Sequence, residues 1–128
     1  MTIRTYALSD NTGLYDMMLK ELGEWSDYYD DTGISPQYQT ALKNCIVYVA
    51  VEKETVCGFI RVRNDDGFCI IVYDLLVHKN YRGKNYGRKL ISHVCTEFPG
   101  TEVYVMSDED GYYEKQGYRR VGSIFELR

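Results

Sequence analysis

The sequence predicts one domain of the α+β class, loosely α/β, in which helices flank a mixed sheet. Its 128 residues are 45% hydrophobic and 27% charged, which suits one soluble domain with a buried core. Apolar residues form strand-like runs in some segments and recur with helical spacing in others. In the second half a strand, a helix and a strand follow one another, and this order requires a parallel strand pair.

The N-terminal third is expected to contain one strand and two helices. Residues 3–7 are predicted to form the strand. A helix capped by one of the polar residues 9–11 should follow, because apolar residues recur at three- and four-residue steps: Leu14, Met17, Met18, Leu22 and Trp25. The acidic, aromatic segment 25–36 is predicted to be a loop. A short helix should then run from Pro36 to about Lys43.

Three strands are predicted in the middle of the chain, at residues 45–51, 55–63 and 68–78. The turn between the last two, at residues 64–67 (NDDG), is a strong hairpin signal. Two adjacent hairpins form a meander, so most of the sheet is expected to be antiparallel.

The C-terminal third is expected to complete the sheet. A helix is predicted at residues 86–98 and a strand at 102–106. A short helix capped by the polar pair 107–108 should follow and end at Gly117. Residues 121–127 are predicted to form the last strand.

Charge and cysteine usage exclude several classes of protein. The net charge of −4 argues against a general nucleic-acid binder. No apolar run has the length of a signal peptide or a membrane span, so a cytoplasmic protein without membrane association is expected. The four cysteines permit two disulfides, but they lack a C-x-x-C pair and reduced thiols are the better interpretation. The two histidines have no cysteine or carboxylate at ligand spacing, so no metal is expected.

A basic stretch stands out against the acidic remainder of the chain. Residues 75–96 contain no acidic residue and five basic ones, so removing those five charges from the net −4 leaves −9. The basic residues cluster at 80–87 (NYRGKNYG), where a predicted strand leads into a helix. A helix N-terminus offers unpaired N–H groups, and Gly83 and Gly87 let the backbone approach a ligand. The pattern indicates a phosphate site; an exposed basic turn is the alternative.

Two common phosphate-binding motifs are absent, because G-x-G-x-x-G is incomplete and no Gly-Lys-Ser/Thr occurs. Instead, residues 73–90 (YDLLVHKNYRGKNYGRKL) resemble the signature of the GNAT superfamily of acetyltransferases, in which a strand leads into Arg/Gln-x-x-Gly-x-Gly/Ala and a helix. Residues 112–118 (YYEKQGY) resemble the family's aromatic-Tyr-Glu-Lys-x-Gly-Phe segment, and the order of elements fits along the whole chain. Asn85 replaces the motif's first glycine, and asparagine tolerates left-handed backbone angles better than most residues.

The resemblance implies one GNAT-like domain over residues 1–128, with a splayed parallel strand pair in a mostly antiparallel sheet. It implies an N-acetyltransferase that moves an acetyl group directly from acetyl-CoA to a primary amine in a ternary complex. The residues that it implies for cofactor binding are Leu75, Leu76, Val77, Arg82, Gly83, Lys84, Asn85, Tyr86, Gly87 and Arg88.

The resemblance also implies catalytic roles. Tyr113 matches the family's general acid, which protonates the sulfur of coenzyme A; Tyr112 is the alternative acid, and Tyr113 as a core-covering side chain is the other interpretation. A backbone N–H near Val77 would stabilise the thioester oxygen. Asp74 is the only carboxylate on the implied cofactor strand and is the candidate base, with a structural carboxylate as an equal alternative.

The acceptor site is implied to lie near the first helices. Carboxylates and aromatic rings there suit a cationic amine, although a solvated acidic loop is the alternative. The residues concerned are Trp25, Tyr28 and Tyr29, interleaved with Glu24, Asp27, Asp30 and Asp31. The acceptor amine can belong to a small molecule or a peptide, and the chain can act as a monomer or a homodimer. The rival functions are an idle acyl-CoA-binding module of the same fold and, far behind, a small nucleic-acid-binding domain.

Overall fold

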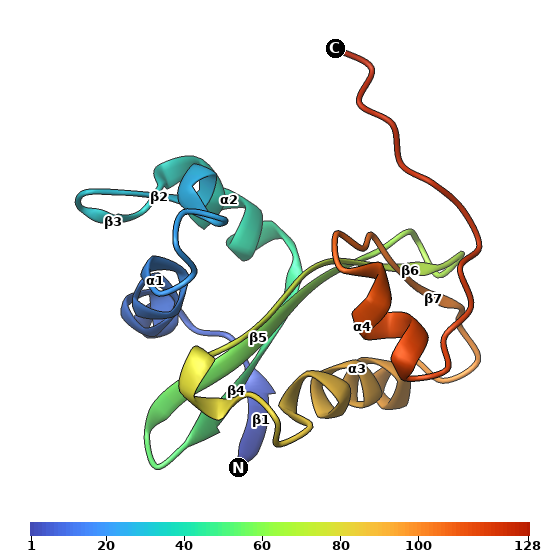
Figure 1. Cartoon of the computed structure of the whole chain (residues 1–128), viewed down its shortest axis with the longest axis horizontal. Helices are drawn as coiled ribbons and strands as arrows, with labels where there is room; N and C mark the ends of the chain where they lie inside the picture. Colours follow the sequence, from blue (N-terminus) through green and yellow to red (C-terminus); the bar gives the residue numbers. More distant parts are fainter.

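The structure is a computed structural model that describes residues 1–128 (Figure 1). At its centre, segments rich in valine and isoleucine form a sheet. Along the chain these strands are β1 (Thr2–Thr5), β4 (Ile46–Glu52), β5 (Thr55–Asn64), β6 (Ile70–Val77) and β7 (Val103–Val105). They lie in the order β1-β4-β5-β6-β7, and every neighbouring pair is antiparallel except the parallel pair β6–β7. The predicted mixed, mostly antiparallel sheet is confirmed.

Helices cover both faces of this sheet (Figure 1). α1 (Asn11–Leu19) and α2 (Pro36–Asn44) pack on one face, and α3 (Tyr86–Glu97) and α4 (Asp110–Lys115) lie on the other. The buried apolar residues form two clusters, one around Phe59 on the α1–α2 face and one around Leu90 on the α3 face. None of these helices is long and apolar enough to cross a membrane.

A β-bulge changes the face to which β6 side chains point. The pairing of β5 with β6 skips Tyr73, so that Val72 packs in the α3 cluster before the bulge and Leu76 packs in the α1–α2 cluster after it. Leu75 and Val77 therefore lie on the α3 side. The end of β6 presents these two side chains to the helix that follows it.

β6 and β7 separate after three residue pairs. Ile70–Val72 pair with Val103–Val105, after which β7 ends and β6 continues to Val77. Beyond β7 one more bond crosses the pair, from the N–H of Met106 to the carbonyl of Val72 at 3.0 Å. The sheet therefore opens beyond this point, as expected for a splayed parallel pair.

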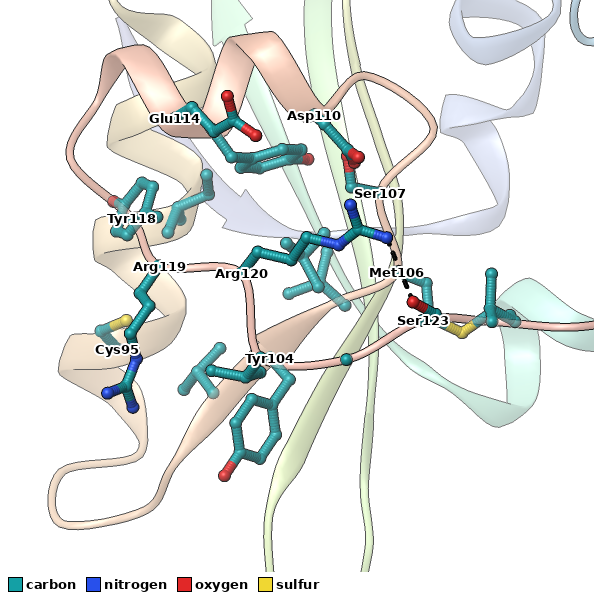
Figure 2. Close-up of a pocket in the computed structure, with 18 residues that line it drawn as sticks. Cys95, Tyr104, Met106, Ser107, Asp110, Glu114, Tyr118, Arg119, Arg120 and Ser123 are labelled. Atoms are coloured by element: carbon teal, nitrogen blue, oxygen red, sulfur yellow. Dashed lines mark hydrogen bonds between the residues drawn. The ribbon is translucent and has the colours of Figure 1, made fainter.

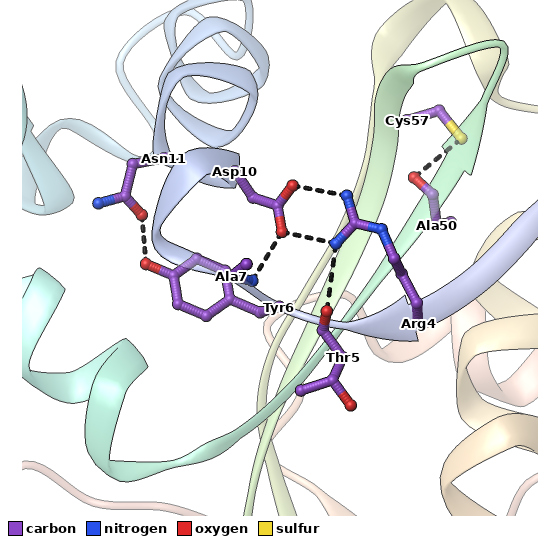
Figure 3. Close-up of polar contacts among 8 residues, drawn as sticks. All are labelled: Arg4, Thr5, Tyr6, Ala7, Asp10, Asn11, Ala50 and Cys57. Carbon is purple, nitrogen blue, oxygen red and sulfur yellow. Dashed lines mark hydrogen bonds and ion pairs between the residues drawn. The ribbon is translucent and has the colours of Figure 1, made fainter.

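The connection from β1 to α1 is fixed by Asp10 (Figure 3). Its carboxylate accepts hydrogen bonds from the guanidinium of Arg4 at 2.8 and 2.9 Å and from the N–H of Ala7 at 2.8 Å. Burial raises the pKa of Asp10, but these bonds outweigh it and hold the pKa below its ordinary value. Asp10 stands at the predicted cap position of α1, although its side chain bonds the preceding residues and not the helix amides.

The first helix is shorter than the sequence predicted. It ends at Leu19, because Leu22 and Gly23 have left-handed φ angles of 55° and 91° and cannot continue it. The side chain of Leu22, predicted to lie on the buried face, is 90% exposed. The turn at Leu22 and Gly23 instead brings Glu21 and Trp25 toward the end of β6.

The segment 25–36, predicted to be a plain loop, contains a small hairpin. β2 (Tyr29–Asp30) pairs with β3 (Gly33–Ile34), and the carboxylate of Asp30 accepts a bond from the N–H of Thr32 at 2.8 Å across the turn. The following helix begins at Pro36 as predicted, and the hydroxyl of Ser35 caps it by accepting a bond from the N–H of Tyr38.

The C-terminal end of the chain differs from the prediction. α4 begins at Asp110, because the hydroxyl of Ser107 accepts its bond from Glu109 N–H at 3.0 Å and so lies outside the helix. Gly117, with φ of 86°, ends this helix as expected. Residues 121–127 form no strand: their apolar side chains are between 60% and 90% exposed, and the segment runs away from the sheet (Figure 1). β7, at three residues, offers such a strand few bonding partners.

All four cysteines are free thiols. Only Cys57 is fully buried, and Cys95 on α3 is exposed. Burial raises the pKa of the Cys57 thiol, so this cysteine behaves as a small apolar core residue.

Candidate functional site

A groove of about 610 Å³ is lined by residues from three parts of the chain that surround the opening between β6 and β7. The end of β6 and the turn into α3 line one side, the segment after α1 lines another, and the segment from β7 into α4 completes it. The predicted site residues on its wall are Trp25, Leu75, Leu76, Val77, Arg82, Gly83, Asn85, Tyr86, Gly87, Arg88 and Tyr113. The other lining residues are Glu21, Glu24, Tyr81, Asp108, Glu109, Tyr112 and Gln116.

The N-terminus of α3 opens into this groove. Asn85 adopts the left-handed conformation with φ 64° and ψ 22°, and its side chain makes no bond to the helix amides. The N–H of Lys89 bonds the carbonyl of Asn85 at 3.0 Å, so the amides of Tyr86, Gly87 and Arg88 have no acceptor within the helix. Three free N–H groups and the positive end of the helix dipole favour an anion.

Two glycines of this turn meet different demands. Gly83 has φ of 83°, a left-handed conformation that a side chain would strain. Gly87 has no such angle, but a Cβ there would collide with the hydroxyl of Tyr112. α4 therefore approaches the first turn of α3 closely through Tyr112, and a larger residue at position 87 would displace the Tyr112 hydroxyl.

The basic side chains of the turn point in different directions. Arg82 donates through Nε to the carbonyl of Val77 at 3.2 Å and pairs through Nη2 with Glu21 at 2.5 Å. It therefore joins the end of β6 to the segment after α1. Lys84, predicted to bind the cofactor, does not line the groove; its ammonium lies 5.3 Å from the ring centre of Tyr81.

Tyr113 is half-buried on the groove wall, and the pKa of its phenol is raised. Burial, followed by the neighbouring Tyr112, raises the pKa of Tyr113 to about 12. A phenol with such a pKa stays protonated at neutral pH, so it can donate a proton. The structure thus brings Tyr113 to the same groove as the open end of α3.

Asp74 lies outside the groove, on the α1–α2 face of the sheet. Its carboxylate pairs with Nε of Arg61 at 2.5 Å and accepts a hydrogen bond from the hydroxyl of Tyr38 at 2.5 Å. Burial, together with this carboxylate, raises the pKa of Tyr38 far above its ordinary value, so the phenol remains the donor. This geometry favours the structural alternative for Asp74 over the role of base.

The predicted acceptor residues are only partly brought together. Trp25 and Glu24 line the groove, whereas Tyr28, Tyr29 and the carboxylates Asp27, Asp30 and Asp31 do not. Tyr28 instead stacks on Tyr38 with ring centres 4.5 Å apart. The ring of Tyr28 also meets that of Trp25 edge-on, with ring centres 5.1 Å apart.

Several lining residues were not assigned to the site from sequence. Asp108 and Glu109 follow β7, and the rule that ligands bind beyond the carboxyl ends of parallel strands would have pointed to them. Gln116 follows α4 and Glu21 precedes the turn at Leu22, and no sequence pattern distinguishes either residue from an exposed polar side chain.

A second cavity of about 520 Å³ lies between α3, β7, α4 and residues 118–124 (Figure 2). The C-terminal segment crosses over Tyr104 there, and Arg120 donates a bond to the hydroxyl of Ser123 at 3.1 Å. Of the predicted site residues only Tyr113 lines this cavity, which it shares with the groove. The groove, not this cavity, is therefore the candidate functional site.

The fold and the groove define an α+β domain with an anion site beside a splayed parallel strand pair. Comparison with known proteins agrees with this class. The family model described as "Acetyltransferase (GNAT) domain" matches residues 43–120. The chain therefore belongs to the GNAT acetyltransferase family, whose members generally use acetyl-CoA and act on small-molecule or peptide acceptors.

Solved structures share the fold over nearly the whole chain. A transcriptional regulator from Bacillus halodurans has a TM-score of 0.78 at 19% identity and covers 99% of this chain and 98% of its own. A GNAT-family acetyltransferase from Streptococcus pneumoniae has a TM-score of 0.68 at 18% identity with 99% and 98% covered. One from Staphylococcus aureus has a TM-score of 0.69 at 19% identity with 94% and 85% covered. At these identities the likeness concerns the fold. No curated protein matches the sequence.

Proposed function

We propose that residues 1–128 act as one acetyltransferase domain that moves an acetyl group from acetyl-CoA to a primary amine while both are bound. The observation that carries this proposal is the open N-terminus of α3, which shares a groove with the phenol of Tyr113. Transfer from a thioester that bears a pyrophosphate requires an anion site and a nearby proton donor. The unpaired amides at the N-terminus of α3 and the phenol of Tyr113 are proposed for these two roles.

The residues of the groove fit acetyl-CoA. The free amides of Tyr86, Gly87 and Arg88 would hold the pyrophosphate, and the guanidinium of Arg82 would add charge beside it. The backbone of Leu75–Val77 would lie along the pantetheine arm, because this stretch of β6 has no partner on the β7 side. When bound, acetyl-CoA supplies the acetyl group as a thioester.

Tyr113 is proposed as the general acid. As the acceptor's nitrogen forms a bond to the acetyl carbon and the carbon–sulfur bond breaks, the phenol gives its proton to the sulfur. It regains one from the nitrogen through solvent, so the net movement is one proton from nitrogen to sulfur. A backbone N–H near Val77 would stabilise the thioester oxygen. Asp74 has no part in this transfer, since Arg61 and Tyr38 hold it on the other face of the sheet.

The test is release of thiol from acetyl-CoA across a panel of primary amines. Tyr113→Phe should lower kcat by roughly ten- to a thousandfold and leave cofactor affinity nearly unchanged. Tyr118→Phe, a change of the same size at a residue that lines only the second cavity, is the matched control. A fall in kcat with Tyr112→Phe and not with Tyr113→Phe would assign the acid to Tyr112.

The pH profile gives a second readout of the same residue. An amine of pKa roughly 10.4 is neutral only about once in a few thousand molecules at pH 7, so kcat/KM should rise with pH. Because the pKa of Tyr113 is raised to about 12, its phenol remains protonated when an ordinary tyrosine ionises, and activity should not fall by pH 10.

A different outcome would favour the rival function. If acetyl-CoA binds but no amine causes release of thiol, the chain is better described as an idle acyl-CoA-binding module.

A further inference from the structure

Two buried side-chain oxygens in this chain lack a hydrogen-bond donor, Oε2 of Glu21 and Oε1 of Gln116. Both residues line the groove. Buried polar atoms in proteins are nearly always satisfied, so the two exceptions require an explanation. Two acceptors without donors in the same groove indicate a ligand that brings N–H donors.

Only one of the two carboxylate oxygens of Glu21 has a partner. Its side chain is only 8% exposed, and Oε1 receives Nη2 of Arg82 at 2.5 Å while Oε2 receives nothing. Gln116 differs because it is neutral, and its own amide N–H donates to the carbonyl of Tyr112 at 3.4 Å. A neutral N–H donor would satisfy the amide oxygen of Gln116. A buried carboxylate oxygen is best satisfied by a cation.

The charges along the groove point the same way. Four carboxylates, Glu21, Glu24, Asp108 and Glu109, share the wall with two guanidinium groups, those of Arg82 and Arg88. The acids come from two segments far apart in the chain, one after α1 and one after β7. A bound pyrophosphate would add negative charge and interact with Arg82, so the excess of negative charge in the groove would grow. Acetyl-CoA brings no cationic group that could balance it.

We propose that Glu21 binds an ammonium group of the acceptor, and that the acceptor carries at least two amino groups. This inference rests on the proposed function. The attacking amine must be neutral, so the ammonium that stays on Glu21 is a second group of the same molecule. Glu24, Asp108 and Glu109 extend the acidic wall for further positive charge. Glu21 thus determines specificity for a di- or polyamine, as a free molecule or as adjacent basic side chains of a peptide.

The test compares 1,4-diaminobutane with butylamine, which has the same chain and one amino group. With acetyl-CoA, the wild type should show kcat/KM at least about tenfold higher for the diamine. Glu21→Gln should abolish this preference, mainly by raising KM for the diamine, so that the ratio of the two kcat/KM values falls to about one. Glu126→Gln, the same change in the exposed C-terminal segment, should leave both values unaltered. A peptide with a lysine beside an arginine, run in parallel, shows whether the acceptor is a free amine or a protein.

Equal kcat/KM for the two amines, or a preference that persists in Glu21→Gln, would overturn the inference. Calorimetric binding of 1,4-diaminobutane to the complex with coenzyme A separates this result from failure of the proposed function. Binding that depends on Glu21 without thiol release contradicts only the proposed reaction; absence of such binding contradicts the inference. If Glu21→Gln does not fold, Glu24→Gln at the exposed neighbouring carboxylate should reduce the same preference by a smaller factor.

Discussion

Two carboxylate–guanidinium pairs with the same 2.5 Å separation lie on different sides of β6. On the α1–α2 face, Asp74 pairs with Arg61 and also accepts the hydroxyl of Tyr38 through the same oxygen. In the groove, Glu21 pairs with Arg82 through one oxygen, and its other oxygen is buried without a donor. The first pair is enclosed by protein, whereas the second borders the groove.

The difference distinguishes the structural interpretation of Asp74 from the binding role that we propose for Glu21. A buried polar network whose members hold each other rigidifies a core, and removing one member is costly. A carboxylate oxygen at a groove that has no donor from the protein is left to accept a hydrogen bond from a bound ligand. Proximity of an acid to the cofactor strand in sequence therefore says less about its role than the donors around it.

The largest expected effect comes from changing Asp74 to Asn. This substitution leaves the largely buried guanidinium of Arg61 without its counter-charge, so we expect the free energy of unfolding to fall by about 3–5 kcal/mol. Urea denaturation measures it. The same change in the other pair, Glu21→Gln, should cost less than about 1 kcal/mol, because the side chain of Arg82 is 50% exposed and its guanidinium stays solvated without the carboxylate. A folded Asp74→Asn protein of native stability that has lost turnover would restore Asp74 as the base.

A smaller effect is expected for the basic turn. Arg82→Ala should weaken coenzyme A binding by about tenfold and make it less sensitive to salt, because a guanidinium beside the pyrophosphate is lost. Lys84→Ala is the control with the same change in net charge, and it should alter affinity by less than about threefold because its ammonium lies against Tyr81, outside the groove. Equal losses for the two variants, measured by calorimetry at two salt concentrations, would mean that only the net charge of the turn matters.

Much of the fold was predictable because local patterns and tertiary structure agree. The turn at residues 64–67, Pro36 and the helical spacing after Tyr86 each signal an element that the structure contains. The errors arose where the backbone departs from the apolar pattern. Leu22 continues the helical spacing of α1 but has a left-handed φ of 55°. Residues 121–127 are apolar enough for a strand but make no backbone bonds to the sheet.

The site was predictable in part for a related reason. The turn into α3 is contiguous in sequence, so its glycines, its basic residues and Asn85 could be recognised together. The acids of the groove are not contiguous. Glu21 lies just after the end of α1, and Asp108 and Glu109 reach the groove because β7 ends beside β6. A β-bulge at Tyr73, which no local pattern announces, decides that Asp74 faces α2.

The account depends most on the claim that the first turn of α3 receives the pyrophosphate. A titration of the ¹⁵N-labelled protein with coenzyme A, followed by NMR, tests this directly. We expect the largest shifts of backbone amide signals at Gly83 and at Tyr86, Gly87 and Arg88. Unchanged signals at these amides, with the largest shifts around the second cavity at Tyr104 and Ser123, would contradict the account.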